Sequence, residues 1–390
     1  MSLFNWSTTP ARKRADYTLP LIPNEIYLHI FDYFAPPTGP LTPGELAMFT
    51  KLSYVCRFFA NHCLTRIFEY LEFSGSVFRD NTPFRIRHDA IKTSRENTLC
   101  TQIAVNQSLA LAIAKTVRIC RFYDWKLDDM DSWAVQRFAN RFTNALSHMK
   151  HLRELTFRNS VVDARHGNAI ATLGSLEKLV FDACEFVQAS AITNVLEDGK
   201  RVKVSDLQVT ACTGNFQAIV AIHPRYLRTL VVDMTFPQQV DWLGQSPLTE
   251  LHLCPGRIFF LTRGWYLERL SIILARAPQS LELLSITFDD GLGTKYILLR
   301  SFGQHLRSSD PPAAVVLASV LDIIGRFTNL RSFRLRDHSV TLGPETPSAE
   351  LRYILRDTFG PTSRLKCVDI FGRVFRSVYG EWSEVSCSVP

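Results

Sequence analysis

Residues 152–157 read LRELTF and residues 176–181 read LEKLVF, and this spacing of large apolar residues decides the fold. In both stretches the first, fourth and sixth positions are apolar, and the residues between them are mostly polar. A short strand shows such alternation when only one of its faces is buried. The same spacing occurs at Leu152-Leu155-Phe157, Leu176-Leu179-Phe181, Val204-Leu207-Val209, Leu227-Leu230-Val232, Leu248-Leu251-Leu253, Leu281-Leu284-Ile286, Leu330-Phe333-Leu335 and Leu365-Val368-Ile370, and Ala114-Val117-Ile119 could be an earlier copy.

The distance between copies indicates a repeat architecture. Early copies follow one another at roughly 20–28 residues, the period of a leucine-rich repeat, in which a short strand alternates with a helix. Later copies are further apart, and the segments 265–277 and 313–327 between them have helical patterns. Residues 265–272 also fit the repeat, but they lie too close to the next copy, so we expect a helix there. One repeat cannot bury its own apolar face, so stacked copies predict an α/β solenoid of short parallel strands and helices.

The position three residues after each copy favours Asn or Cys in such repeats, because it lies in a tight turn. Cys184 and Cys212 occupy this position, and Ser160, Thr235 and Asp289 occupy it in other copies. We therefore expect buried structural cysteines here rather than metal ligands or nucleophiles, since a free cysteine usually behaves as a small core residue.

Composition excludes several classes of protein. The chain has 390 residues, 46% of them apolar, and a net charge of +7, which argues against wholesale disorder. Its basic residues are dispersed, so we do not expect a nucleic-acid partner. The only tight basic run is Arg12-Lys13-Arg14. This run is too short to show whether it is a nuclear localisation signal, a phosphate-binding site or part of a solvated tail.

The sequence predicts an intracellular protein, cytoplasmic or nuclear, with no membrane partner. The N-terminus lacks the apolar segment of a signal peptide, and no window approaches ~18 uninterrupted apolar residues. Nine cysteines, an odd number without a C-x-x-C pair, suit a reducing compartment. The glycosylation motifs at Asn5 and Asn106 are then chance matches.

Three short amphipathic helices are predicted near the N-terminus. Residues from Pro23 onward carry an apolar stripe up to Phe34, and a proline- and glycine-rich breaker follows. Further helices are expected over residues 43–60 and 61–71. Such a small domain cannot bury all of its apolar side chains. It must therefore offer an interface or pack against the rest of the chain, and composition does not choose between the two.

These helices resemble a known family. The segments LIPNEI at residues 21–26, Ile30-Phe31, and LSYVCRFF at residues 52–59 resemble the F-box in order and spacing, and residues 67–73 stand where an F-box closes. The resemblance covers residues 19–73. It departs from the family pattern in an insertion at residues 36–44, which is familiar in F-box proteins of the fungal type.

The resemblance implies a substrate-receptor subunit of an Skp–cullin–F-box ubiquitin ligase. Its F-box would dock on an Skp-family adaptor, and through it on a cullin, while the repeats hold a protein target. Ubiquitin transfer would then be accelerated by proximity, so this chain would not itself be an enzyme. The residues that the motif implies for adaptor contact or the small F-box core are Leu21, Ile22, Pro23, Glu25, Ile26, Ile30, Phe31, Leu52, Val55, Cys56, Phe58 and Phe59.

The outward positions of the repeat strands are the expected target surface, because side chains alternate across a strand. Their charges are mixed, which predicts recognition of a specific polar pattern rather than of bulk charge. The expected target-binding residues are Glu154, Thr156, Arg158, Lys178, Asp182, Asp206, Gln208, Asp233, Glu250, His252, Arg334 and Arg336.

Motifs for catalysis or cofactors were not found. The sequence has no P-loop, dinucleotide-binding loop, H-E-x-x-H or G-x-S-x-G motif, and His223 and His252 lack partner spacing, so no cofactor is expected. The acidic residues Asp124, Asp128, Asp129 and Asp131 favour helix capping ahead of a helix over residues 133–149 rather than a cation site. Two alternatives stay open: a repeat scaffold outside any ligase, and an enzyme whose site is built from scattered residues.

The predicted organisation has five parts. They are a flexible tail at residues 1–18, the F-box at 19–73, a helical or irregular linker at 74–113, the solenoid at 114–376 and a C-terminal tail at 377–390.

Overall fold

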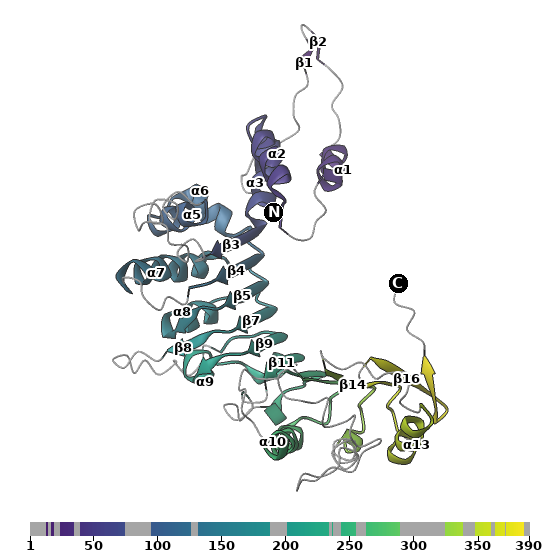
Figure 1. The fold of residues 1–390 in the computed structure, drawn as a ribbon. Helices are drawn as coiled ribbons and strands as arrows, with labels where there is room; N and C mark the ends of the chain where they lie inside the picture. Colours follow the sequence, from purple (N-terminus) through teal and green to yellow (C-terminus); the bar gives the residue numbers. More distant parts are fainter. Residues whose placement is uncertain are drawn as a thin grey trace, which may run out of the picture. The chain divides into compact units, whose positions relative to one another are not determined.

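The computed structural model describes part of the chain in two compact units (Figure 1). Unit 1 comprises Met1–Lys178, Cys184–Val202 and Ile219–Ala221, and unit 2 comprises Leu179–Ala183, Lys203–Ala218 and Ile222–Pro390. The described residues are 13–14, 17–18, 24–34, 40–74, 95–125, 132–187, 201–233, 236, 243–254, 263–288, 324–337, 348–359, 363–370 and 372–385.

Unit 1 begins with three helices, α1 (Asn24–Phe34), α2 (Pro43–Ser53) and α3 (Arg57–Glu69). Thr42 caps α2: its hydroxyl accepts a hydrogen bond from the amide of Glu45, whose carboxylate in turn accepts one from the amide of Thr42. The predicted helix over 43–60 is wrong in its end. The chain turns at residues 54–56, where Cys56 is extended, and the next helix starts at Arg57.

The tail predicted to be flexible contains two short paired strands. These are β1 (Lys13–Arg14) and β2 (Tyr17–Thr18), which pair antiparallel.

The sheet of unit 1 starts earlier than the sequence predicted. Its strands β3 (Tyr70–Ser74), β4 (Ile119–Tyr123) and β5 (Glu154–Arg158) are parallel and adjacent in this order. The expected F-box boundary at residue 73 therefore runs through the first strand. Register also corrects the suspected early copy, because Cys120 and Phe122 face inward and Ile119 does not. The apolar triplet of β3 is Phe68-Leu71-Phe73, and that of β4 is Val117-Cys120-Phe122.

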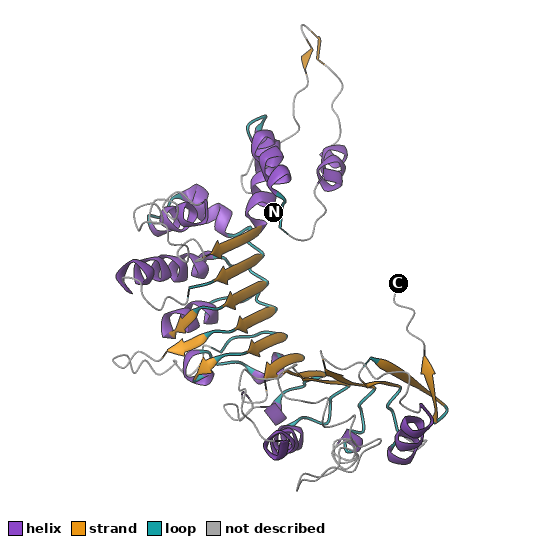
Figure 2. Cartoon of the chain, in the orientation of Figure 1, coloured by secondary structure: helices purple, strands orange, loops and turns teal. Residues whose placement is uncertain are grey.

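Helices cover one face of this sheet (Figure 2). Phe142, from the helix expected over 133–149, stacks on Phe122 at 4.5 Å between ring centroids. Gly167 in α8 is required by packing, since a Cβ atom there would overlap the carbonyl oxygen of Ile219. The helices are α5 (Arg95–Ala104), α6 (Ser108–Ala114), α7 (Ser132–His148) and α8 (Ala164–Ala171), and the short strands β6 (Val161–Asp163) and β8 (Glu185–Val187) pair beside them.

Unit 2 is a large, mostly parallel sheet with helices beside it. The strands β9, β11, β12, β13, β14 and β15 pair in parallel in this order, and β16 pairs antiparallel with both β15 and β17. In order along the sheet they are β7 (Lys178–Asp182), β9 (Asp206–Thr210), β11 (Thr229–Asp233), β12 (Glu250–Cys254), β13 (Leu283–Phe288), β14 (Ser332–Asp337), β15 (Cys367–Ile370), β16 (Arg373–Val378) and β17 (Glu381–Val385). The expected C-terminal tail thus contributes a strand.

The helical segments of unit 2 include α10 (Arg263–Arg276), where the sequence predicts a helix over 265–277. Most of the expected helix at 313–327 lies outside the described residues. The other segments are β10 (Thr213–Gly214), α9 (Phe216–Ile219), η2 (Pro224–Tyr226), η4 (Leu243–Gln245) and α13 (Ser348–Thr358). The chain is therefore a mixed α/β protein, as its sequence predicts.

One turn recurs after four strands, and in three of them it directly precedes the position predicted to hold a small polar residue. Asp124, Asn159, Ala183 and Ala211 all have φ between 48° and 60°. The next side chain then points back: the Ser160 hydroxyl donates to the carbonyl of Arg158 at 2.8 Å, and the Cys212 thiol donates to that of Thr210 at 3.2 Å. Cys184 is buried, as expected, and its thiol donates to the carbonyl of Phe157 at 3.4 Å. Cys212 is only partly buried, which corrects the expectation for that position. Thr235 and Asp289 lie outside the described residues.

Candidate protein-binding surfaces

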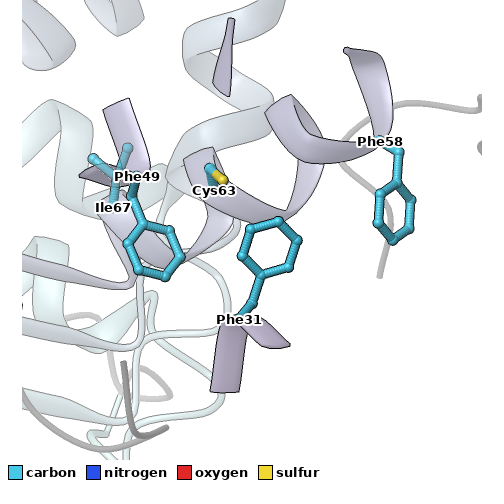
Figure 3. Packing of buried hydrophobic residues seen from close by; sticks show 5 residues of the cluster. All are labelled: Phe31, Phe49, Phe58, Cys63 and Ile67. Atoms are coloured by element: carbon cyan, nitrogen blue, oxygen red, sulfur yellow. The ribbon is translucent and has the colours of Figure 1, made fainter. Parts of the chain in front are cut away.

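The three N-terminal helices share a small aromatic core (Figure 3). Phe31 of α1 stacks on His62 of α3 with ring centroids 4.6 Å apart and meets Phe59 edge-on at 5.1 Å. Phe49 is fully buried on α2. The buried members of this helical core are Phe31, Phe49, Phe58, Cys63 and Ile67.

Apolar side chains outside this core are exposed on the same helices. Ile26 and Ile30 on α1 are 48% and 45% exposed, and Val55 in the turn before α3 is 63% exposed. Leu28, Tyr33 and Tyr54 are exposed as well. We call these six residues the apolar helix surface. Because the core is already formed without them, their apolar area is available to a partner.

The structure divides the predicted adaptor residues into two groups. Phe31 and Phe58 belong to the core, and Leu52, Cys56 and Phe59 are partly buried against it. Ile26, Ile30 and Val55 are exposed, as is Glu25. Leu21, Ile22 and Pro23 lie outside the described residues.

His62 packs against the helical core and has two charged neighbours, Asp32 and Arg66. Burial lowers the pKa of its imidazole, the nearby Arg66 guanidinium lowers it further, and the Asp32 carboxylate partly opposes them. Since the ring packs on Phe31, its protonation state bears on how α1 is held.

The face of the unit 1 sheet opposite the helices carries a connected polar cluster. Glu154 lies 3.7 Å from Arg121 and 3.5 Å from Lys178. The Arg121 guanidinium in turn lies over the ring of Tyr70, 5.3 Å from its centroid. The sequence placed only Glu154 and Lys178 at this site, with Thr156 and Arg158 beside them. Tyr70 and Arg121 were missed because Phe68-Leu71-Phe73 and Val117-Cys120-Phe122 were not identified as repeat copies.

The outward face of unit 2 brings most of its predicted target residues into register. Gln208, His252 and Arg334 lie in one row across the strands, and Asp206 and Glu250 lie in the next row. Burial lowers the pKa of His252 and the Arg334 charge lowers it further, while Glu250, 3.6 Å away, raises it. The rows are Asp206, Thr229, Glu250, Leu283, Ser332, Cys367 and Arg376, and Gln208, Val231, His252, Ser285, Arg334, Asp369 and Val374.

Asp233 does not belong to this surface, which corrects the prediction. Its side chain is buried, with the residue only 3% exposed, and its carboxylate accepts hydrogen bonds from the backbone amides of Ala211 and Phe236, both at 3.1 Å. Two other predicted charges are partly engaged: Asp182 accepts from the Thr210 hydroxyl at 3.1 Å, and Arg336 pairs with Asp369 at 2.9 Å.

No group of three or more His, Cys, Asp or Glu in the described ranges is placed to hold a metal ion. Of the acidic cluster ahead of α7 only Asp124 is described, and its carboxylate accepts a hydrogen bond from the Asn159 amide at 2.8 Å. None of the described helices has the length and apolar character needed to cross a membrane.

No family model matches this chain, and no curated protein matches it in sequence. The two surfaces can act by non-covalent binding: the helix surface offers apolar side chains, and the sheet faces offer charged and polar ones.

Proposed function

We propose that this chain is the target-receptor subunit of an Skp–cullin–F-box ubiquitin ligase. The helices α1 to α3 act as an F-box that docks on an Skp-family adaptor, and the strands form a leucine-rich-repeat-like solenoid that holds a protein target. The apolar helix surface is the observation that carries this proposal. A ligase receptor positions its target near the conjugating enzyme and needs no catalytic residue of its own.

The location of these apolar residues supports docking rather than internal packing. Phe31 and Phe58 are buried in the helical core, whereas Ile30, next to Phe31, is exposed to solvent. On a helix, neighbouring positions face different sides, so one helix can serve a core and an interface together. Interface cores are enriched in such apolar side chains and depleted in charges.

Co-purification with a Skp-family adaptor tests the proposal. A V55D variant should weaken adaptor binding about 30-fold, because a charge would be buried at the centre of an apolar interface. The matched control is V105D, which places the same charge on an equally exposed valine in the turn after α5. Val55 is 63% exposed and Val105 is 64% exposed, so the two variants differ in location only.

Point variants are sharper here than deletion of the N-terminal region. Removing residues 1–75 would also remove β3, which pairs along its length with β4. Failure of the unmodified chain to bind any Skp-family adaptor would leave the alternative of a repeat scaffold outside any ligase. Equal loss in V55D and V105D would show that the apolar helix surface is not the docking site.

A further inference from the structure

The solvent-accessible charges on the outward face of β9 to β16 are separated by sign along the strand order. Asp369 on β15 lies among the basic residues, but it is buried and pairs with Arg336 at 2.9 Å. Asp206 on β9 and Glu250 on β12 are acidic, whereas Arg334 on β14 and Arg376 on β16 are basic. Both arginines are exposed, and the Glu250 side chain is 46% exposed. Neither Asp206 nor Arg334 forms an ion pair with any described residue. Arg334 is exposed and Asp206 is partly exposed, so both charges can reach a ligand.

The register gives the distance between the two charged regions. Glu250 is opposite Leu283 on β13, which is opposite Ser332 on β14, and Arg334 lies two residues further along that strand. Strands about 4.8 Å apart and a rise of about 3.4 Å per residue place the Cα atoms of Glu250 and Arg334 about 12 Å apart. An extended peptide covers this distance with about three to four residues.

The residues between the two regions have uncharged side chains. Leu283, Ser285 and Ser332 occupy the intervening positions, and His252 lies beside Glu250. A separation of about 12 Å exceeds the Debye length of about 8 Å at physiological salt, so the acidic and basic regions do not cancel one another in solution. Each region therefore keeps its own electrostatic preference.

We propose that this face binds an extended peptide segment of the target that carries basic residues over β9–β12 and acidic residues over β14–β16. The two groups of residues in that segment are separated by about two to three neutral residues. This inference rests on the proposed function, because it names the kind of target segment that the receptor holds. Charge complementarity of this type gives specificity, since a uniformly charged segment is repelled by one of the two regions.

Fluorescence anisotropy with the intact chain and three labelled peptides tests the inference. One peptide carries a lysine pair and a glutamate pair separated by a short Gly-Ser spacer. The second replaces the glutamates by lysines, and the third replaces the lysines by glutamates. The mixed peptide should bind about tenfold more tightly than either uniform one, and raised salt should remove the difference. Equal affinity for all three peptides would overturn the proposal.

Charge-reversal variants locate the site. R334E should shift the preference to the all-lysine peptide, and E250K should shift it to the all-glutamate peptide. The matched control is R276E, which reverses an exposed arginine in the last turn of α10. Circular dichroism and thermal unfolding establish that each variant is folded. If R276E shifts the preference as much as R334E does, or if neither R334E nor E250K shifts it, the assignment of this face is wrong.

Failure of this inference can be told apart from failure of the proposed function. Adaptor binding by the unmodified chain, together with equal binding of the three peptides, contradicts the inference alone. Preference for the mixed peptide without adaptor binding contradicts the ligase role alone and supports the binding face within a scaffold.

Discussion

The buried carboxylate of Asp233 accepts a hydrogen bond from the backbone amide of Ala211 at 3.1 Å. Ala211 follows β9 and Asp233 ends β11, so this bond connects a turn to the neighbouring strand of the same sheet. The same carboxylate also accepts from the amide of Phe236. The acidic residue that ends this strand therefore acts as a buried structural acceptor and not as part of the outward face.

Replacing Asp233 with Ala should destabilise the protein by about 2 kcal/mol, because buried backbone amides lose their acceptor. The change is measured as the free energy of unfolding in urea. Asp206→Ala on the neighbouring outward row is the control and should change stability by less than about 0.5 kcal/mol. A similar small effect at both sites would show that the Asp233 hydrogen bonds contribute little.

Replacing Ala211 with Gly should stabilise the protein by about 0.5–1 kcal/mol. Ala211 has φ of 54°, where its Cβ atom is unfavourable and glycine is not strained. Ala218→Gly within α9 is the control and should have the opposite sign, since glycine weakens a helix. The comparison uses thermal unfolding midpoints. Destabilisation by A211G would mean that the turn tolerates alanine without strain.

The stability of the helical core should depend on pH through His62. Burial lowers the pKa of His62 in the folded chain below its ordinary value of 6.5, so the unfolded chain binds a proton more readily. As the pH falls below about 6.5, stability should therefore decrease, and it should level off below the folded-state pKa. His62→Gln should lose this contribution, whereas His29→Gln on the exposed side of α1 should keep it. The measurement is thermal unfolding of each variant between neutral and mildly acidic pH.

A pH dependence unchanged by the His62 variant would contradict this account. In that case the pH dependence would come from other titrating groups and not from His62, whose charged neighbours are Asp32 and Arg66.

Thiol labelling should separate the cysteines by burial. Burial raises the pKa of Cys63 and of Cys100 to about 12, and that of Cys120 well above its ordinary value, so little thiolate forms at neutral pH. Cys56, Cys212 and Cys367 are partly exposed. An aromatic disulfide reagent followed by mass spectrometry should modify these three first in the native chain and reach Cys63, Cys100 and Cys120 only on unfolding.

The protein should also stay folded with all cysteines reduced and after treatment with a metal chelator. Loss of the helical circular dichroism signal on chelation, or zinc detected in the intact protein by mass spectrometry, would contradict this expectation.

Local pattern was sufficient for the strands that carry the repeat spacing and for which of their residues face inward. Leu155 and Phe157 alternate with more polar neighbours, and both are buried. Such alternation can be recognised from a few consecutive residues. The turn position of Cys184 and Cys212 was predictable for the same reason. The strand β3 was missed because residues 67–73 were assigned to the end of the F-box. The register of β4 was missed because Cys120 is smaller than the large apolar residues of the other copies, although it occupies the same inward position.

The sequence by itself determined the α/β class, the positions of the strands that carry the repeat spacing, and the apolar stripes of the N-terminal helices, since these follow from the spacing of neighbouring residues. Only the tertiary structure decided that Phe31 is buried while Ile30 is exposed, that Tyr70–Ser74 joins the sheet, and that the Asp233 carboxylate is occupied by backbone amides. Each of these depends on residues distant along the chain. Burial and hydrogen-bond partners are set by such neighbours, which no local pattern contains.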